Sequence, residues 1–214
     1  MTLLLYAFLG GAKADEITVY DGDATNSKIP VNGLYVDTQG TTSEFIIPAE
    51  TDGMSDMIGG TITKLTFYIP ATPATWGEPT IQLYMGEVGG TTLSSIYGPS
   101  NFTVVATGVW DNTKTTIEIE LDDPFVYNGD NLLIGTYVLT ASSTYKSANF
   151  AGVTAESGAS IYNNGSGSGT AQSFLPKTTI EYTPGSGTTV ERPTTFTVSN
   201  VTAYEATLKL RSEE

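Results

Sequence analysis

The sequence predicts an all-β fold, an antiparallel two-sheet β-sandwich of jelly-roll type. Apolar and polar residues alternate along much of the chain from Ile17 onward, as they do in strands with one buried and one exposed face. Gly, Pro, Asn and Asp separate these runs, and such residues favour tight turns. The composition agrees, because 39% of the residues are apolar and only 15% are charged. About nine short strands at roughly ten-residue spacing are typical of a sandwich.

The first 14 residues resemble the end of a secretory signal peptide. Residues 3–9 form an apolar run, and Ala12-Lys13-Ala14 fits the small-x-small pattern that precedes a cleavage site. The basic segment that normally comes first is missing, so we expect only a partial signal peptide at 1–14. A hydrophobic first strand is the alternative. A signal peptide implies a mature start at Asp15 and a protein that is secreted or lies at the cell surface.

Four strands are predicted in the first half of the domain, at residues 17–20, 44–47, 61–69 and 81–85. The last two each place three alternate apolar residues on one face, as half-buried antiparallel strands do. The only helical turn that we expect lies within residues 48–58, where Pro48 can begin it and Gly59-Gly60 can end it.

Five more strands are predicted in the second half, at residues 102–106, 115–121, 132–139, 146–153 and 178–182. The second of these alternates most clearly and should end before Asp123-Pro124. The third is nearly continuous in apolar character, which indicates a central strand covered on both faces. Residues 163–169 contain only Asn, Gly and Ser, so a mobile loop is expected there.

A boundary follows the sandwich, which is predicted to span residues 15–184. A linker rich in Gly, Ser and Thr is expected at 185–192. In residues 193–214, a proline, a short strand, the run NVTA and the run ATL together resemble the first two strands of a fibronectin type III domain. The resemblance implies a truncated start of such a domain, which has no partner sheet of its own.

Three longer motifs resemble a group of secreted and surface β-sandwich modules of Bacteroidetes. The group includes cleaved-adhesin and haemagglutinin-type domains. The motifs are GGTITKLTFYI at 59–69, PFVYNGDNLLIGTY at 124–137 and SFLPKTTIEYTPG at 173–185. This resemblance implies a jelly-roll domain beside fibronectin type III repeats, with a role in adhesion and in binding glycans or proteins.

The composition also excludes several chemistries. The chain has no His and no Cys, so a Ser-His-Asp triad and a zinc site built on those side chains are excluded. The formal net charge of -14 should repel nucleic-acid phosphates, and no run reaches the ~18 apolar residues of a membrane span. We therefore expect a non-catalytic binding module, with a structural spacer of a larger surface protein as an alternative.

Loop aromatics are the predicted ligand-binding residues. Trp76 lies in a Pro- and Gly-rich segment, and Trp110 precedes the turn at Asp111-Asn112. Exposed rings of this kind stack on sugars or anchor a protein partner. The alternative is that the rings close the open ends of the sandwich as core residues. The candidate ligand-binding residues are Trp76, Trp110, Tyr97, Tyr145 and Tyr162.

Glu118, Glu120 and Asp122 suggest an enzymatic alternative. They alternate along one strand, and glycoside hydrolases hold two carboxylates across a sugar. The order Glu-x-Glu-x-Asp differs from the Glu-x-Asp-x-Glu of laminarinase-like enzymes. The simpler interpretation is the solvated face of an amphipathic strand.

Acidic turns suggest a possible structural Ca²⁺. Asp21, Asp23 and Asn26 offer hard oxygen ligands, and Asp122-Asp123 with Asp130 offers a second group. The complete EF-hand loop is missing, and these residue types are also ordinary in turns.

Overall fold

The computed structural model describes residues 14–33, 35–143, 146 and 148–185, and the backbone of two further strands at 197–202 and 205–209. Every strand pairing in these residues is antiparallel. Two short 3-10 helices accompany the strands, η1 (Met54–Met57) and η2 (Pro99–Asn101). The described part of the chain contains no helix long and apolar enough to cross a membrane.

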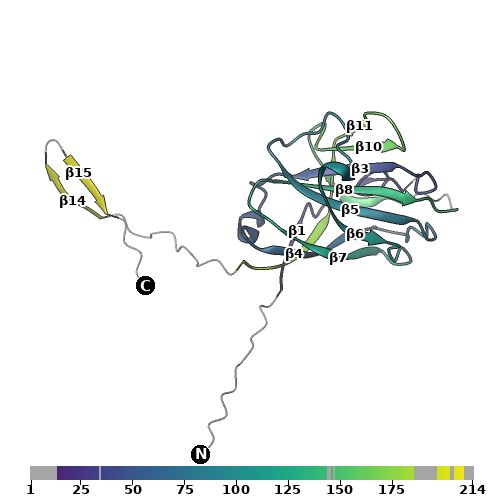
Figure 1. The fold of residues 1–214 in the computed structure, drawn as a ribbon, viewed down its shortest axis with the longest axis horizontal. Coiled ribbons are helices and arrows are strands. Elements are labelled where there is room, and N and C mark those ends of the chain that lie inside the picture. Colours follow the sequence, from purple (N-terminus) through teal and green to yellow (C-terminus); the bar gives the residue numbers. More distant parts are fainter. Residues whose placement is uncertain are drawn as a thin grey trace, which may run out of the picture.

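Three sheets form the body of the molecule (Figure 1). The four-stranded sheet has, in spatial order, β1 (Asp15–Val19), β13 (Thr178–Thr183), β4 (Thr61–Tyr68) and β7 (Thr116–Val126). The six-stranded sheet has β11 (Thr170–Gln172), β10 (Ser160–Asn164), β3 (Thr41–Ile47), β8 (Asn131–Thr140), β5 (Thr80–Val88) and β6 (Thr103–Gly108). The three-stranded sheet has β12 (Phe174–Pro176), β9 (Phe150–Thr154) and β2 (Ala24–Asn26).

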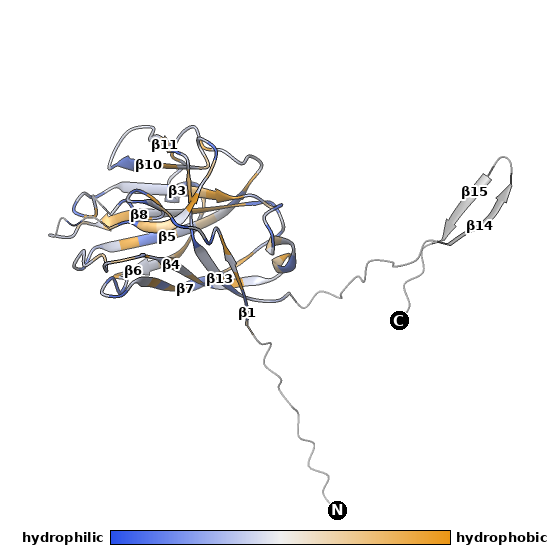
Figure 2. Ribbon diagram, turned by 180° about the vertical axis from the view of Figure 1, so that it is seen from behind, coloured by the Kyte–Doolittle hydropathy of each residue, from blue (hydrophilic) through white to orange (hydrophobic). Residues whose placement is uncertain are grey.

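The main hydrophobic core joins the two larger sheets. Phe45 of β3 and Phe67 of β4 meet edge to face, with ring centroids 6.2 Å apart, and both rings are fully buried. Alternate apolar residues of β4, β7 and β13 join those of β3, β5 and β8 in this cluster. Figure 2 shows the corresponding hydrophobic residues within β3, β5 and β8. This arrangement is consistent with a β-sandwich.

All nine predicted strands overlap an observed strand, and the all-β class is confirmed. The nearly continuous apolar strand is β8, which lies between β3 and β5 as a central strand should. β9 begins only at Phe150. β7 continues through Pro124 to Val126, so the prediction that the strand ends before Asp123-Pro124 is wrong. An edge strand tolerates Pro because one row of its N–H groups has no partner strand, and β7 is at the edge of its sheet.

The expected mobile loop at 163–169 is instead partly strand. Asn163 and Asn164 end β10, which pairs with β11 in a hairpin. The side-chain oxygen of Asn163 accepts hydrogen bonds from the amides of Thr42 and Gly165, so the polar side chain holds the turn against β3. The predicted helical turn at 48–58 is a single 3-10 turn, η1, with Met54 and Met57 buried.

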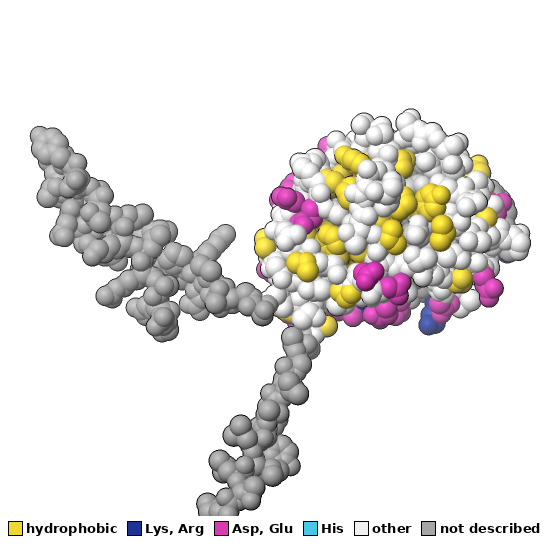
Figure 3. All heavy atoms as spheres, viewed as in Figure 1, with side chains coloured by type: hydrophobic (Ala, Val, Ile, Leu, Met, Phe, Trp, Pro, Cys, Tyr) yellow, Lys and Arg dark blue, Asp and Glu magenta, His cyan; other side chains and the backbone are white. Residues whose placement is uncertain are grey.

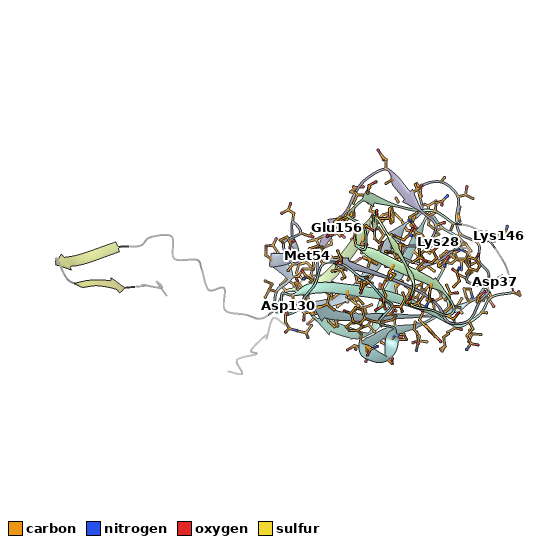
Figure 4. All side chains as sticks on the ribbon, turned by 90° about the horizontal axis from the view of Figure 1, so that it is seen from above. Lys28, Asp37, Met54, Asp130, Lys146 and Glu156 are labelled. Atoms are coloured by element: carbon orange, nitrogen blue, oxygen red, sulfur yellow. The ribbon has the colours of Figure 1, made fainter. Side chains whose placement is uncertain are left out.

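The predicted signal peptide, linker and fibronectin-like strands lie at the two ends of the chain. The apolar run at 3–9 and the linker from residue 186 onward lie outside the described residues. At the C-terminal end, β14 (Thr197–Thr202) and β15 (Glu205–Lys209) pair with each other in a sheet of their own. Figure 4 shows Asp130, which precedes β8, and Lys146, which follows it, at opposite ends of the body.

Candidate binding site

Two loops meet at one end of the body. The 69–79 loop follows β4, and the 109–115 loop precedes β7. The backbone amide of Ile69 donates to the carbonyl of Thr115 over 2.8 Å, at the base of both loops. The 69–79 loop also lines a cavity of 380 Å³ with Ala148 and Asn149, so it lies at the end where Figure 4 labels Lys146.

Asn112 joins the tips of these loops. Its backbone carbonyl accepts from the amide of Thr75, and its side-chain oxygen accepts from the amide of Trp76, both over 2.9 Å. Its side-chain nitrogen donates to the carbonyls of Gly77 over 2.9 Å and Trp110 over 3.1 Å. Asn112 is buried, and a buried amide with these partners fixes the geometry of the loops.

A cavity of 570 Å³ lies between the joined loops. Val109 is 53% exposed and faces the solvent here, whereas Trp110 is only 8% exposed and packs in the main core, so the expectation of an exposed ring does not hold at Trp110. A volume of this size and a mixture of apolar and polar walls are typical of small-ligand sites. The lining residues are Thr75, Gly77, Glu78, Val109, Trp110, Asp111, Asn112 and Thr113.

The backbone is strained at the cavity wall. Thr75 has a φ of 49°, in the left-handed region that β-branched residues rarely adopt. Gly77, two residues later, has a φ of 80° and adopts it without strain because it has no Cβ. Strained residues persist where their surroundings hold them, often at functional sites, and here Asn112 accepts from the Thr75 amide.

The cavity carries negative charge. Hydrogen bonds from the hydroxyl and amide of Thr113, at 2.6 and 3.0 Å, together with nearby Lys114, lower the pKa of Asp111 to about 2. Asp111 is therefore ionised at neutral pH, and Glu78 lines the same wall. The carboxylates can accept hydrogen bonds from ligand hydroxyls. Lys114, 3.2 Å from Asp111, compensates one of the two charges, so Glu78 gives the cavity a net negative charge that disfavours an anionic ligand.

Trp76 is a buried core residue, as the alternative interpretation of the loop aromatics predicted. It is 1% exposed, and its ring packs against Phe150 with centroids 5.9 Å apart. The indole cannot present a stacking face to solvent, so the expectation of an exposed ring does not hold at Trp76. Large aromatic side chains gain most free energy when their whole area is buried, and the end of the sandwich offers that space. Trp76 supports the cavity from inside.

The predicted tyrosines do not gather at this cavity. Tyr97 is 47% exposed and contacts Phe102, which stacks on Tyr84 of the six-stranded sheet. Tyr162 lies on β10, where its ring faces the ammonium of Lys28 at 5.0 Å. Tyr145 lies outside the described residues.

The carboxylates of the enzymatic alternative lie on the outer face of β7. One ammonium, that of Lys64, is 3.3 Å from Glu118 and 3.7 Å from Glu120, and it is 3.0 Å from Glu181. Asp122 accepts instead from the amide of Thr107 on β6. Figure 3 shows acidic side chains gathered along the margin where Figure 1 places β7. Glu118 and Glu120 are therefore both paired with Lys64.

Two of the three predicted calcium ligands, Asp21 and Asn26, have other partners. Asp21 forms an ion pair of 2.6 Å with Lys177, and the side-chain oxygen of Asn26 accepts from the amides of Lys28 and Ile29. Within the residues that the structure describes, no group of three or more acidic side chains is placed to hold a metal ion. This includes the second predicted group, at Asp122-Asp123 and Asp130.

Sequence reasoning missed Val109, Asn112 and the strained Thr75. An exposed valine beside a tryptophan was a possible signal for Val109. The bonds of Asn112 depend on the other loop, so the sequence carries no local signal for them. The fold and the cavity define an all-β protein with a loop-built concave site at one end. No protein-family model, curated protein or solved structure matches the chain.

Proposed function

We propose that this chain is a non-catalytic ligand-binding module that serves adhesion and binds its ligand in the cavity beside Trp110. One observation carries the proposal. Two loops far apart in the sequence are joined by buried Asn112, so the concave site between them is formed before any ligand arrives. Binding to a preformed site avoids the entropy cost of ordering its loops.

An uncharged glycan suits this cavity better than an anionic ligand. Val109 offers apolar contact to the C–H face of a sugar ring, and buried Trp110 supports the cavity wall behind it. Glu78 and Asp111 can accept hydrogen bonds from hydroxyl groups. Catalysis is not part of the proposal, because the candidate carboxylates pair with Lys64 on a different face.

The cellular setting is part of the same proposal. The signal-like residues 1–14 support a secreted or cell-surface protein, and the motif at 124–137 supports a jelly-roll module of the Bacteroidetes surface type. That motif forms the turn into β8 and most of the central strand. The antiparallel pairing of β14 and β15 is compatible with the start of a fibronectin type III neighbour.

A glycan-array screen of the full chain tests the binding proposal. Val109→Ser removes an exposed apolar contact at the cavity, and Val126→Ser is its matched control, because Val126 is 51% exposed at the far end of β7. We expect neutral glycans to bind, Val109→Ser to lose most of the signal and Val126→Ser to keep it. Trp110→Ala should also lose binding, and its thermal unfolding shows whether the fold survives.

Two results would contradict the proposal. Equal glycan binding by Val109→Ser and the wild type would move the site away from this cavity. Silence across a broad array of neutral glycans would exclude the glycan ligand, and a protein partner or a structural spacer would then be the better interpretation.

A further inference from the structure

A second cavity, of 310 Å³, lies at the same end of the body. Ile69 and Pro70 form one side of it, and Thr115 and Thr116 form another. It therefore lies at the base of the two loops whose tips form the Trp110 cavity. Its volume is at the lower end of the range for small-ligand sites and suits a ligand of one ring.

An ion pair forms the polar wall of this cavity. Lys177 Nζ lies 2.6 Å from Asp21 Oδ1, and the Lys177 amide donates to the carbonyl of Ala151 over 2.8 Å. The Lys177 side chain is partly exposed and that of Asp21 is mostly exposed. An ammonium has three donors and a carboxylate accepts several bonds, so both groups keep capacity for a ligand.

Tyr68 forms the aromatic wall and is itself held in place. Its hydroxyl and that of Thr179 are 2.7 Å apart, and the Lys177 ammonium lies 4.6 Å from the ring centroid. One face of the ring therefore lies beside the ammonium, and the exposed apolar side chain of the cavity is Pro70, since Ile69 is only 3% exposed. The donor, the acceptor and the ring are thus positioned before a ligand binds.

The charges select against anions. Asp21 and Asp23 contribute two negative charges and Lys177 one positive charge, so phosphate, sulfate and carboxylate ligands meet net repulsion. A pyranose ring has a C–H face that packs on apolar side chains, and its hydroxyls both donate and accept hydrogen bonds. An acceptor and a donor 2.6 Å apart match two neighbouring hydroxyls.

We propose that the Tyr68–Lys177–Asp21 cavity is a separate binding site for one uncharged pyranose ring. Asp21 accepts from one ring hydroxyl, Lys177 donates to its neighbour, and Pro70 and the edge of the Tyr68 ring contact the C–H face. Each cavity has its own lining residues, so this site can bind with the Trp110 cavity empty.

Saturation-transfer NMR on the full chain tests this site, with neutral methyl hexopyranosides as probes and a methyl hexuronide as the anionic counterpart. We expect at least one neutral probe to bind and the hexuronide to bind at least about tenfold more weakly. Asp21→Asn and Lys177→Met should each weaken binding about tenfold or more, because each removes a charge-assisted hydrogen bond. Asp123→Asn and Lys114→Met are matched controls on exposed residues outside the cavity and should bind as the wild type does.

Further variants keep the test decisive. Asp23→Asn leaves the Lys177–Asp21 pair intact and removes one negative charge from the cavity, so a smaller preference of this variant for the neutral probe over the hexuronide supports the site even where Lys177→Met unfolds. Asp21→Asn should weaken monosaccharide binding by the same factor in the Val109→Ser background as in the wild type, which separates this site from the Trp110 cavity. The proposal is overturned if no neutral probe binds, if the hexuronide binds more tightly, or if the folded Asp21 variant binds as the wild type does.

Discussion

Tyr84 donates its hydroxyl hydrogen to Oε1 of Glu44 over 2.6 Å, although β8 lies between their strands. Gly135 of β8 lies between them in the sheet and is the register partner of both residues. A Cβ on Gly135 would lie only 2.1 Å from the Tyr84 ring, so the missing side chain lets that ring cross the strand. Glu44 also accepts from the amides of Tyr97 and Gly98, at 3.1 and 2.7 Å. A buried carboxylate thus ties the β5–β6 connection to the sheet.

Glu44→Gln should release that connection. A Gln oxygen at the Oε1 position keeps the bonds from Tyr84 and Gly98, but the charge is lost. The NH2 group takes the Oε2 position, to which the Tyr97 amide donates, so we expect a loss of about 2 kcal/mol in the free energy of unfolding. Hydrogen exchange at the amides of Tyr97 and Gly98 should speed up more than in the strands. Glu50→Gln, on an exposed residue, is the control. Unchanged exchange at both amides would show that Glu44 does not hold this segment.

Gly135→Ala should destabilise the fold by about 3 kcal/mol, because the new methyl group displaces the Tyr84 ring and the Glu44 bond with it. Gly108→Ala is the matched control, since Gly108 is also in a strand and a Cβ added there would have no neighbour within 4 Å. Urea unfolding measures both. Similar midpoints for the two variants would contradict the steric argument.

Tyr84 should make stability depend on alkaline pH. Burial and the charge of Glu44 raise the pKa of Tyr84 above its ordinary value of 10.0. The folded chain keeps this proton where the unfolded chain releases it, so the stabilisation is complete below about pH 10 and falls as the pH rises further. Tyr84→Phe should reduce that decline by up to about 1.4 kcal/mol per pH unit. Urea unfolding between about pH 9 and 11.5 tests it, and identical slopes would refute it.

Thr75→Gly should raise the free energy of unfolding by about 0.5–1 kcal/mol, because glycine relieves the positive φ at some cost in chain entropy. Thr72→Gly, in the same exposed loop and without a positive φ, should instead lower it slightly. Thermal unfolding compares the two variants. Equal destabilisation would mean that Thr75 carries no strain.

Glu120→Gln should change the free energy of unfolding by less than about 0.5 kcal/mol, since exposed ion pairs contribute little and Lys64 keeps Glu181 and Glu118. We also expect no release of reducing sugars by the wild type from any glycan that it binds. Hydrolysis that Glu120→Gln abolishes would restore the glycosidase interpretation.

Strand positions were largely predictable, and the exceptions have physical reasons. The alternation at 115–121 marks β7 because one of its faces is buried and the other is wet. β2, β11 and β12 have three residues each, too few to show a period of two. The prediction that this strand ends before Asp123-Pro124 is wrong because a strand at the edge of a sheet tolerates Pro. Only the sheet order shows that β7 is an edge strand.

The loops of the candidate site were predictable, and their chemistry was not. Pro, Gly and turn residues marked the segments around Trp76 and Trp110 as loops. Whether each indole faces the solvent depends on neighbours such as Phe150, which lies far along the chain. The ion pair of Asp21 with Lys177 could not be predicted either, because the two residues lie far apart in the sequence. Asp21 was therefore predicted as a calcium ligand.

Local sequence patterns were enough to establish the all-β class, most strand positions and the lack of His and Cys chemistry, because alternation and composition need no knowledge of distant contacts. The three-dimensional fold was needed to learn which groups meet: Asn112 with the 69–79 loop, Lys177 with Asp21, and Glu44 with Tyr84 across Gly135. Strand order and register bring these residues together, and they follow from the packing of the whole core.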